Sequence, residues 1–94
     1  MRGGTVYILA SRRNGTLYIG VTYNLAERLF QHRTGRGSKF VQKYGVLTLV
    51  WYEQYPLYLD AIQRETNLKR WKRTWKLALI EQMNPEWNDL ALSL

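Results

Sequence analysis

Two short runs of apolar, β-branched and aromatic residues open the chain, Thr5 to Ala10 and Leu17 to Thr22. Between them lies Asn14-Gly15, the strongest short signal for a tight β-turn. We therefore predict a β-hairpin. With Asn14-Gly15 at the centre of a two-residue turn, Tyr7 would stand opposite Thr22.

Alternation along these strands separates the hairpin into two faces, because successive strand residues point in opposite directions. Tyr7 and Tyr18 share one face with Leu9 and Gly20, and Gly20 leaves room beside the two phenols. The other face is wholly apolar and is predicted to pack against helices; it carries Val6, Ile8, Ala10, Leu17, Ile19 and Val21.

Helical periodicity and stop signals divide the remaining chain. Asn24 is a good N-cap, Gly35 a good helix stop, and Pro56 ends a run of β-formers. The predicted elements are a helix over about 24–35, a basic loop with a short helix over 33–44, a third strand over 46–55, helices over about 59–72 and 74–83, and a short amphipathic turn over 86–94. We predict an α+β fold, a three-stranded antiparallel sheet flanked by helices, in a single domain over 1–94.

The composition limits which metal sites and covalent links the protein can form. The chain has no cysteine and one histidine, so thiolate zinc sites and disulfides are excluded, and a hard cation such as Mg²⁺ or Mn²⁺ is the metal we expect. No apolar run approaches the roughly 18 residues of a membrane span and no signal-peptide pattern opens the chain, so we expect a cytoplasmic protein without a membrane partner.

The 94 residues carry 14 Lys and Arg against 7 Asp and Glu, a formal net charge of +7. Basic residues alternate with Trp and Tyr along the chain rather than gathering on one flank of an amphipathic helix. This pattern favours nucleic acid over a membrane surface as the partner. The alternative is a ribosomal-type or merely soluble basic protein.

Glu65 stands out among the candidate functional residues, because its helical position falls on the apolar side that should face the sheet. A carboxylate there needs a cation, since burying it alone costs several kcal/mol. That cation is either a metal ion or Arg28 or Lys69. Arg28 and His32 lie one turn apart on the first helix and can act on one ligand; the alternative is that both are ordinary solvated residues.

These residues together resemble the GIY-YIG nuclease domain over essentially the whole chain. Its motif halves match Thr5-Val6-Tyr7 and Tyr18-Ile19-Gly20. Thr5 and Val6 replace Gly and Ile of the first half, but the tyrosine is kept. The small stand-alone bacterial members are the most similar, notably over Trp71 to Ile80 and in Asn84-Pro85-Glu86-Trp87.

The resemblance implies roles for six residues. Glu65 would ligate a single divalent cation, Mg²⁺ or Mn²⁺, and Arg28 would contact the scissile phosphate. Tyr7 and Tyr18 would handle the attacking water, with either one as the base. His32 would support this proton chemistry. The sixth residue, which would help to shape the metal and phosphate site, is Asn84.

We expect basic residues outside this site to bind the substrate, although a run of charged residues usually forms only a solvent-exposed face. The candidate nucleic-acid-binding residues are Arg12, Arg13, Lys39, Lys43, Lys69 and Lys72.

The sequence thus predicts a divalent-metal-dependent endonuclease that hydrolyses phosphodiester bonds in DNA. Larger relatives add a separate DNA-binding part, so specificity here would come from these 94 residues or from a targeting partner protein. That favours single-stranded or structured DNA, as in repair or recombination. The alternatives are a non-catalytic nucleic-acid-binding module of the same fold and a ribonuclease.

Overall fold

The computed structural model describes residues 3–94; residues 1 and 2, where the predicted domain begins, lie outside the described part. Its sheet has three antiparallel strands in the order β2-β1-β3. They are β1 (Gly4–Ala10), β2 (Leu17–Thr22) and β3 (Thr48–Tyr55). Every residue of the central strand β1 is buried. The predicted α+β fold with a three-stranded antiparallel sheet is confirmed.

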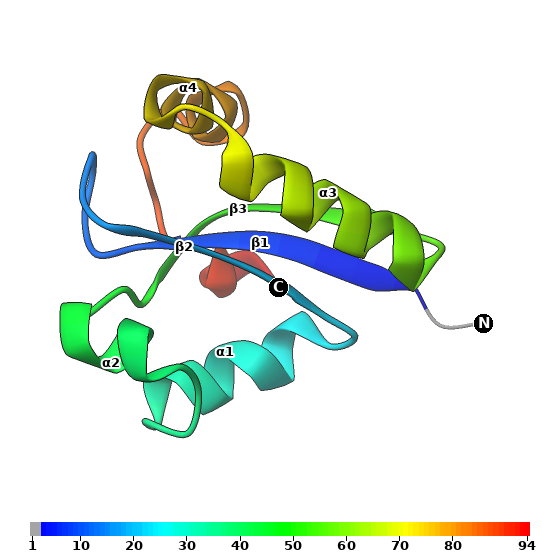
Figure 1. Ribbon diagram of the computed structural model, residues 1–94. Helices are drawn as coiled ribbons and strands as arrows, with labels where there is room; N and C mark the ends of the chain where they lie inside the picture. The colour runs from blue at the N-terminus through cyan, green and yellow to red at the C-terminus, as the bar shows by residue number, and fades with distance from the viewer. Residues whose placement is uncertain (1–2) are drawn as a thin grey trace.

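Helices cover both faces of the sheet (Figure 1). One face is packed by α3 (Tyr58–Arg70) and α4 (Arg73–Met83), and the other by α1 (Leu25–Arg33) and α2 (Lys39–Tyr44). A short 3-10 helix, η1 (Leu90–Ser93), contacts β3 near the C-terminus. The longest helix has 13 residues, so no helix of residues 3–94 could cross a membrane.

Alternation along β1 produces two separate apolar clusters, one on each face. Val6 and Ile8 belong to the cluster under α3 and α4, which also contains Leu68 and Ile80. The cluster on the α1 and α2 side contains Tyr7, Leu9, Leu25, Leu29, Val41, Val46 and Leu49. The apolar face predicted from the hairpin pattern is therefore the one that packs against α3 and α4.

The hairpin differs from the predicted one in the length of its loop. Ser11 N donates to Thr16 O at 3.0 Å, which leaves residues 12–15 as a four-residue loop. Asn14 takes a positive φ of 58°, as its short polar side chain allows. Tyr7 therefore stands opposite Gly20 and not Thr22. Because the observed register differs from the predicted one by two residues, each side chain keeps its face of the sheet. Tyr7 and Tyr18 therefore still lie on the same face.

A tertiary contact holds this loop. The Arg73 guanidinium at the start of α4 donates to the carbonyl oxygens of Asn14 at 2.7 Å and Gly15 at 2.6 Å. These bonds satisfy two loop carbonyls and join the end of the hairpin to the α4 layer. A partner 58 residues away cannot be read from the turn sequence, which explains why turn chemistry alone predicted the wrong loop.

Candidate active site

The ring of Tyr7 lies across β2, because Gly20 directly opposite has no side chain. A Cβ atom at Gly20 would come within 2.5 Å of both Cζ and Oη of Tyr7. Since β2 is an outer strand, the Tyr7 hydroxyl is directed toward that edge of the sheet. The room that the sequence predicted beside Gly20 is thus filled by the Tyr7 ring.

His32 meets the Tyr7 hydroxyl from α1. Its Nε2 lies 3.0 Å from Tyr7 Oη, and its Nδ1 has no hydrogen-bond partner among residues 3–94. Tyr18 packs edge-on against the imidazole, with ring centroids 5.4 Å apart. Burial lowers the pKa of His32 and the positive charge of Arg28 lowers it further. His32 is therefore neutral at neutral pH, since even its ordinary pKa is about 6.5.

The pKa of the Tyr7 hydroxyl responds to charged residues on two helices. Burial raises its pKa well above the usual value, Tyr18 and Glu65 act in the same direction, and Arg28 opposes them. Arg28 on α1 and Glu65 on α3 therefore influence the same hydroxyl with opposite charges. The phenol is protonated at neutral pH.

Arg28 is placed by the capping of α1. Asn24 Oδ1 accepts the Glu27 N–H at 3.1 Å and so begins the helix one turn before Arg28. The guanidinium Nη1 donates to Gln31 Oε1 at 3.2 Å. Arg28 also lines a surface hollow of about 340 Å³ with Tyr23 and the N-terminal turn of α1. The side chain is half-buried and reaches solvent there.

Glu65 comes from α3 on the other layer and its side chain is 17% exposed. Its Oε2 lies 3.3 Å from Nζ of Lys69, one helical turn further on. Of the two ion pairs that the sequence allowed, the structure contains the one with Lys69 and not the one with Arg28. No other hydrogen bond to the Glu65 carboxylate occurs within residues 3–94, so the carboxylate keeps capacity for a further cation.

Asn84 lies at the end of α4, away from the hydrogen bonds just described. Its Nδ2 donates to the carbonyls of Val50 at 3.2 Å and Asn88 at 2.8 Å, and its Oδ1 accepts the Asn88 N–H at 3.0 Å. The side chain is buried and joins β3 to the C-terminal segment. None of its hydrogen bonds reaches Tyr7, Arg28 or Glu65.

The predicted nucleic-acid-binding cations are all exposed, but they lie in three separate places. Two are in the hairpin loop, two on α2, and two at the end of α3 and just beyond it. Within this set, Arg13 lies 3.9 Å from Glu81, Lys69 pairs with Glu65, and Lys72 stands over the Trp75 ring. The full set is Arg12, Arg13, Lys39, Lys43, Lys69 and Lys72.

Residues 3–78 match the model of the GIY-YIG catalytic domain. The chain belongs to the GIY-YIG family. It is 37% identical over 81 residues to a UPF0213 protein of Oceanobacillus iheyensis, covering 86% of this chain and 93% of that one. A UPF0213 protein of Syntrophus aciditrophicus is 38% identical over 82 residues, covering 86% of this chain and 92% of that one.

A solved structure agrees with this family assignment. The solution NMR structure of a UPF0213 protein from Bacillus halodurans aligns with a TM-score of 0.58 at 26% identity, over 93% of this chain and 92% of that one. Small bacterial UPF0213 proteins are therefore homologues of this GIY-YIG chain, as the sequence predicted. A GIY-YIG catalytic domain implies a nuclease-like function and a nucleic acid as the substrate.

The side chains near Tyr7 are compatible with the single divalent cation that GIY-YIG nucleases typically use. Residues 3–94 contain no group of three or more His, Asp or Glu side chains that could enclose a metal ion. Mg²⁺ does not need such an enclosure, because it usually keeps several waters and binds one or two carboxylates together with substrate phosphates. Glu65 is the carboxylate whose charge acts on the pKa of Tyr7.

Two further tyrosines, which the sequence did not single out as candidate site residues, lie close together. Tyr23, just before α1, and Tyr58, the first residue of α3, stack with ring centroids 3.9 Å apart. The charges of Arg28 and Glu65 both act on the pKa of Tyr58. Tyr58 and Glu65 are seven residues apart and so share a helix face, a relation that the sequence alone shows.

Proposed function

We propose that this protein is an endonuclease that hydrolyses phosphodiester bonds in single-stranded or structured DNA, with one Mg²⁺ or Mn²⁺ as cofactor. One observation supports the proposal above all others. The Tyr7 hydroxyl lies 3.0 Å from the Nε2 of a neutral histidine and is directed toward the outer edge of the sheet, and its pKa responds to the opposite charges of Arg28 and Glu65. A purely structural arrangement does not need this combination.

The proton chemistry follows from the Tyr7 and His32 pair. A protonated phenol is a poor base, so Tyr7 must lose its proton as it takes one from the attacking water. Neutral His32 can accept that proton at Nε2 when Nδ1 carries the ring hydrogen. We assign Tyr7 as the residue that exchanges its proton with His32. Tyr18, whose ring centroid lies 6.3 Å from that of Tyr7, packs edge-on against the same imidazole.

The reaction also requires that the negative charge developing on the phosphate be stabilised. Arg28 presents a planar set of donors that can hold two phosphoryl oxygens at once. Glu65 would hold the divalent cation, which supplies a second positive centre on the phosphate when it is bound. The cation would use the carboxylate capacity that the ion pair with Lys69 leaves free.

The remaining predicted residues act outside the reacting centre. Asn84 is proposed as a positioning residue, because its three hydrogen bonds tie β3 to the C-terminal segment. The exposed cations are proposed to hold the nucleic acid backbone, with Lys39 and Lys43 on the α2 side and Arg12 and Arg13 at the end of the hairpin.

One contact favours a second candidate function, a non-catalytic nucleic-acid-binding module. The Lys69 ammonium at 3.3 Å compensates the Glu65 charge without any metal ion. In a binding module, the only role of Glu65 would be to form this ion pair. The two functions therefore differ in what happens when each partner of the pair is removed.

The test is a cleavage assay with purified protein and labelled single-stranded DNA, duplex DNA, branched DNA and RNA, in Mg²⁺, in Mn²⁺ and in EDTA. We expect metal-dependent cleavage of single-stranded or branched DNA. Glu65→Gln should lower it by about 10²-fold or more, because a positive centre on the phosphate is lost. Nucleic-acid affinity should stay within a few-fold, since the substitution adds no repulsion to phosphate.

Two variants serve as controls for the Glu65 assignment. Lys69→Ala removes the ion pair but keeps the carboxylate, so turnover at saturating DNA should survive. Glu86→Gln removes an exposed carboxylate two positions after Asn84 and should leave the cleavage rate unchanged. Equal losses in Glu65→Gln and Lys69→Ala would mean that the ion pair alone matters, and cleavage of RNA in preference to DNA would make the protein a ribonuclease.

A further inference from the structure

Two aromatic side chains of α2 continue the ring contacts of the candidate active site toward solvent. The Tyr18 ring that packs against His32 also lies 6.1 Å from the Phe40 ring, centroid to centroid, and Phe40 lies 4.8 Å from Tyr44 in the same measure. Phe40 is 42% exposed and Tyr44 is 48% exposed. The candidate active site is thus continuous, through Tyr18, with aromatic surface that solvent reaches.

Caps at both ends and one buried anchor hold α2 in place. Ser38 Oγ accepts the Phe40 N–H at 3.1 Å at the start of the helix, and Gly45 ends it with a positive φ of 61°. Val41 is fully buried and belongs to the apolar cluster that contains Tyr7. The two exposed rings are therefore carried by a helix that is fixed to the core.

Cations accompany the two rings on the same helix. Lys39 and Lys43 are one turn apart, and each comes immediately before one of the rings, so a row of two ammonium groups runs beside the row of two rings. Both lysines are exposed and form no ion pair among residues 3–94; the Lys43 ammonium lies 5.4 Å from the centroid of the Tyr44 ring. No Asp or Glu occurs from residue 28 to residue 52. The partner that this charge pattern attracts is an anion.

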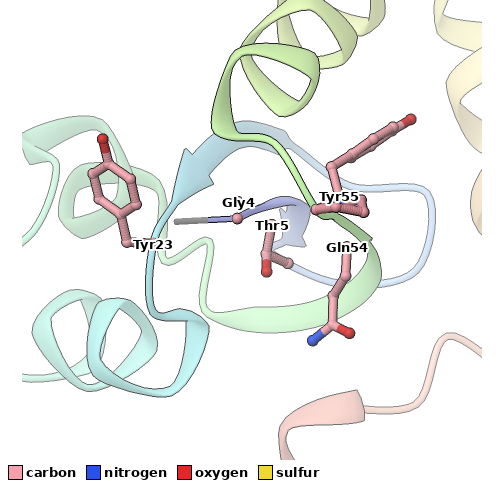
Figure 2. Close-up of a pocket in the computed structure, with 7 residues that line it drawn as sticks. Gly4, Thr5, Tyr23, Gln54 and Tyr55 are labelled. Carbon is pink, nitrogen blue, oxygen red and sulfur yellow. The ribbon is translucent and has the colours of Figure 1, made fainter. Parts of the chain in front are cut away.

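A hollow beside the start of β1 and the end of β3 lacks this charge. It has a volume of about 510 Å³, and Figure 2 shows Thr5, Gln54 and Tyr55 around it. Among the described residues its lining contains neither Lys nor Arg, so they offer no counter-charge to a phosphate backbone. Of these two surfaces, α2 is the one that suits nucleic acid.

We propose that Phe40 and Tyr44 stack against unpaired nucleobases of a single DNA strand whose backbone is held by Lys39 and Lys43, next to the proposed active site. The proposal rests on the proposed function and adds to it the surface that binds the flanking nucleotides. Aromatic side chains bind the bases of single strands by stacking, and nearby cations bind the backbone. The bases of a duplex are already stacked between their neighbours, so this surface selects strands with unpaired bases.

The experiment compares two single strands that differ only in their bases. One is a DNA strand of mixed sequence, and the other has the same length but abasic nucleotides in its centre. Fluorescence anisotropy measures the affinity of the protein for each strand in EDTA, where metal-dependent cleavage is blocked. The unmodified protein should bind the strand with bases more tightly by about 5- to 150-fold for each base that stacks. Phosphate contacts are the same in both strands and cancel from this ratio.

Phe40→Leu and Tyr44→Leu, singly and together, remove the rings and keep apolar side chains at both positions. The double variant should lose most of the preference for the strand with bases, while its affinity for the abasic strand stays within a few-fold. Tyr44→Phe keeps the ring and should keep the preference. Phe30→Leu removes a ring that is 59% exposed on α1, beside a different hollow, and should also keep it. Thermal midpoints identify any loss that comes from unfolding, and the two single variants decide if the double variant does not fold.

The outcomes separate this stacking surface from the nuclease assignment. Equal affinity of the unmodified protein for the two strands, or a preference that survives in the folded variants without the rings, overturns the stacking surface even if the protein cleaves DNA. A dimer in solution that dissociates when the rings are replaced would make them a contact between two copies of the chain and would also overturn it. A ring-dependent preference without any metal-dependent cleavage by the unmodified protein supports the stacking surface and overturns the proposed nuclease.

Discussion

The properties of His32 depend on contacts made from three directions. Tyr7 meets its Nε2, the Tyr18 ring lies against its edge, and Gly37 leaves the space beside Nδ1 that any side chain would fill. Burial among these groups favours the neutral imidazole, which is the form able to accept a proton from Tyr7.

The lowered pKa of His32 predicts a pH dependence of stability. Below the ordinary histidine pKa of about 6.5, the unfolded chain binds a proton that the folded chain resists, so the free energy of unfolding should decrease as the pH falls through this region. Calorimetric thermal midpoints between about pH 8 and pH 5 measure the effect. His32→Gln should lose less stability over this range, and parallel curves for the two proteins would disprove the prediction.

Arg28→Lys should damage turnover more than binding. Lysine keeps the charge but not the planar set of donors, and losing a donor to developing charge costs roughly 10²-fold in rate at comparable sites. Single-turnover cleavage, affinity and thermal midpoint are measured on one preparation. Arg36→Lys, at an exposed arginine, is the matched control. A stable Arg28→Lys protein with near-normal turnover would rule out the phosphate role.

At the scale of elements, the site depends on how β1, β2 and α1 fit together. The hairpin register places Gly20 opposite Tyr7, and the Asn24 cap sets the start of the helix that carries Arg28 and His32. Each contact is local, but together they determine where the Tyr7 hydroxyl meets the imidazole.

Gly20→Ala is predicted to disturb Tyr7 through this element contact. The added Cβ would lie within 2.5 Å of the phenol, so the ring must move, at a cost of about 1–3 kcal/mol in stability and with a loss of cleavage. Chemical denaturation of Gly20→Ala, Tyr7→Ala and the double variant forms a mutant cycle. The effect of Gly20→Ala should largely disappear when Tyr7 is absent, whereas additive effects would exclude the steric explanation.

At the scale of the whole molecule, the net charge of +7 is carried on separate surfaces of a body with a radius of gyration of 12.4 Å. Several arginines are engaged in ion pairs, including Arg33 with Asp89 at 2.8 Å and Arg64 with Glu53 at 3.0 Å. The lysines of α2 are exposed and form no ion pair among residues 3–94, so they remain available to phosphate groups.

Salt dependence of binding tests this assignment. Each phosphate contact on a single strand contributes about −0.7 to the slope of log affinity against log salt concentration. The double variant Lys39→Gln, Lys43→Gln should therefore make the slope shallower by about 1.4, with little change in turnover at saturating DNA. Fluorescence anisotropy of a labelled single strand at several salt concentrations measures it. An unchanged slope would remove α2 from the nucleic-acid interface.

Much of the fold could be predicted because local sequence patterns specify it. Strand alternation, the Asn24 cap and Pro56 mark elements through interactions among near neighbours, and the predicted strands and helices lie within a few residues of the observed ones. The hairpin faces were also predictable, because side-chain direction alternates with a period of two and a displacement by two residues preserves it. The loop length was not, because Arg73 contributes to it from α4.

The sequence by itself determined the order and type of the elements, the shared face of Tyr7 and Tyr18, and the family to which the chain belongs. Tertiary structure alone decided that His32 meets the Tyr7 hydroxyl, that Glu65 pairs with Lys69 rather than Arg28, and that Tyr23 stacks on Tyr58. The physical reason is that periodicity specifies which face of an element a residue occupies. It does not specify which face of another element lies opposite, because that depends on how the layers pack against the sheet as a whole.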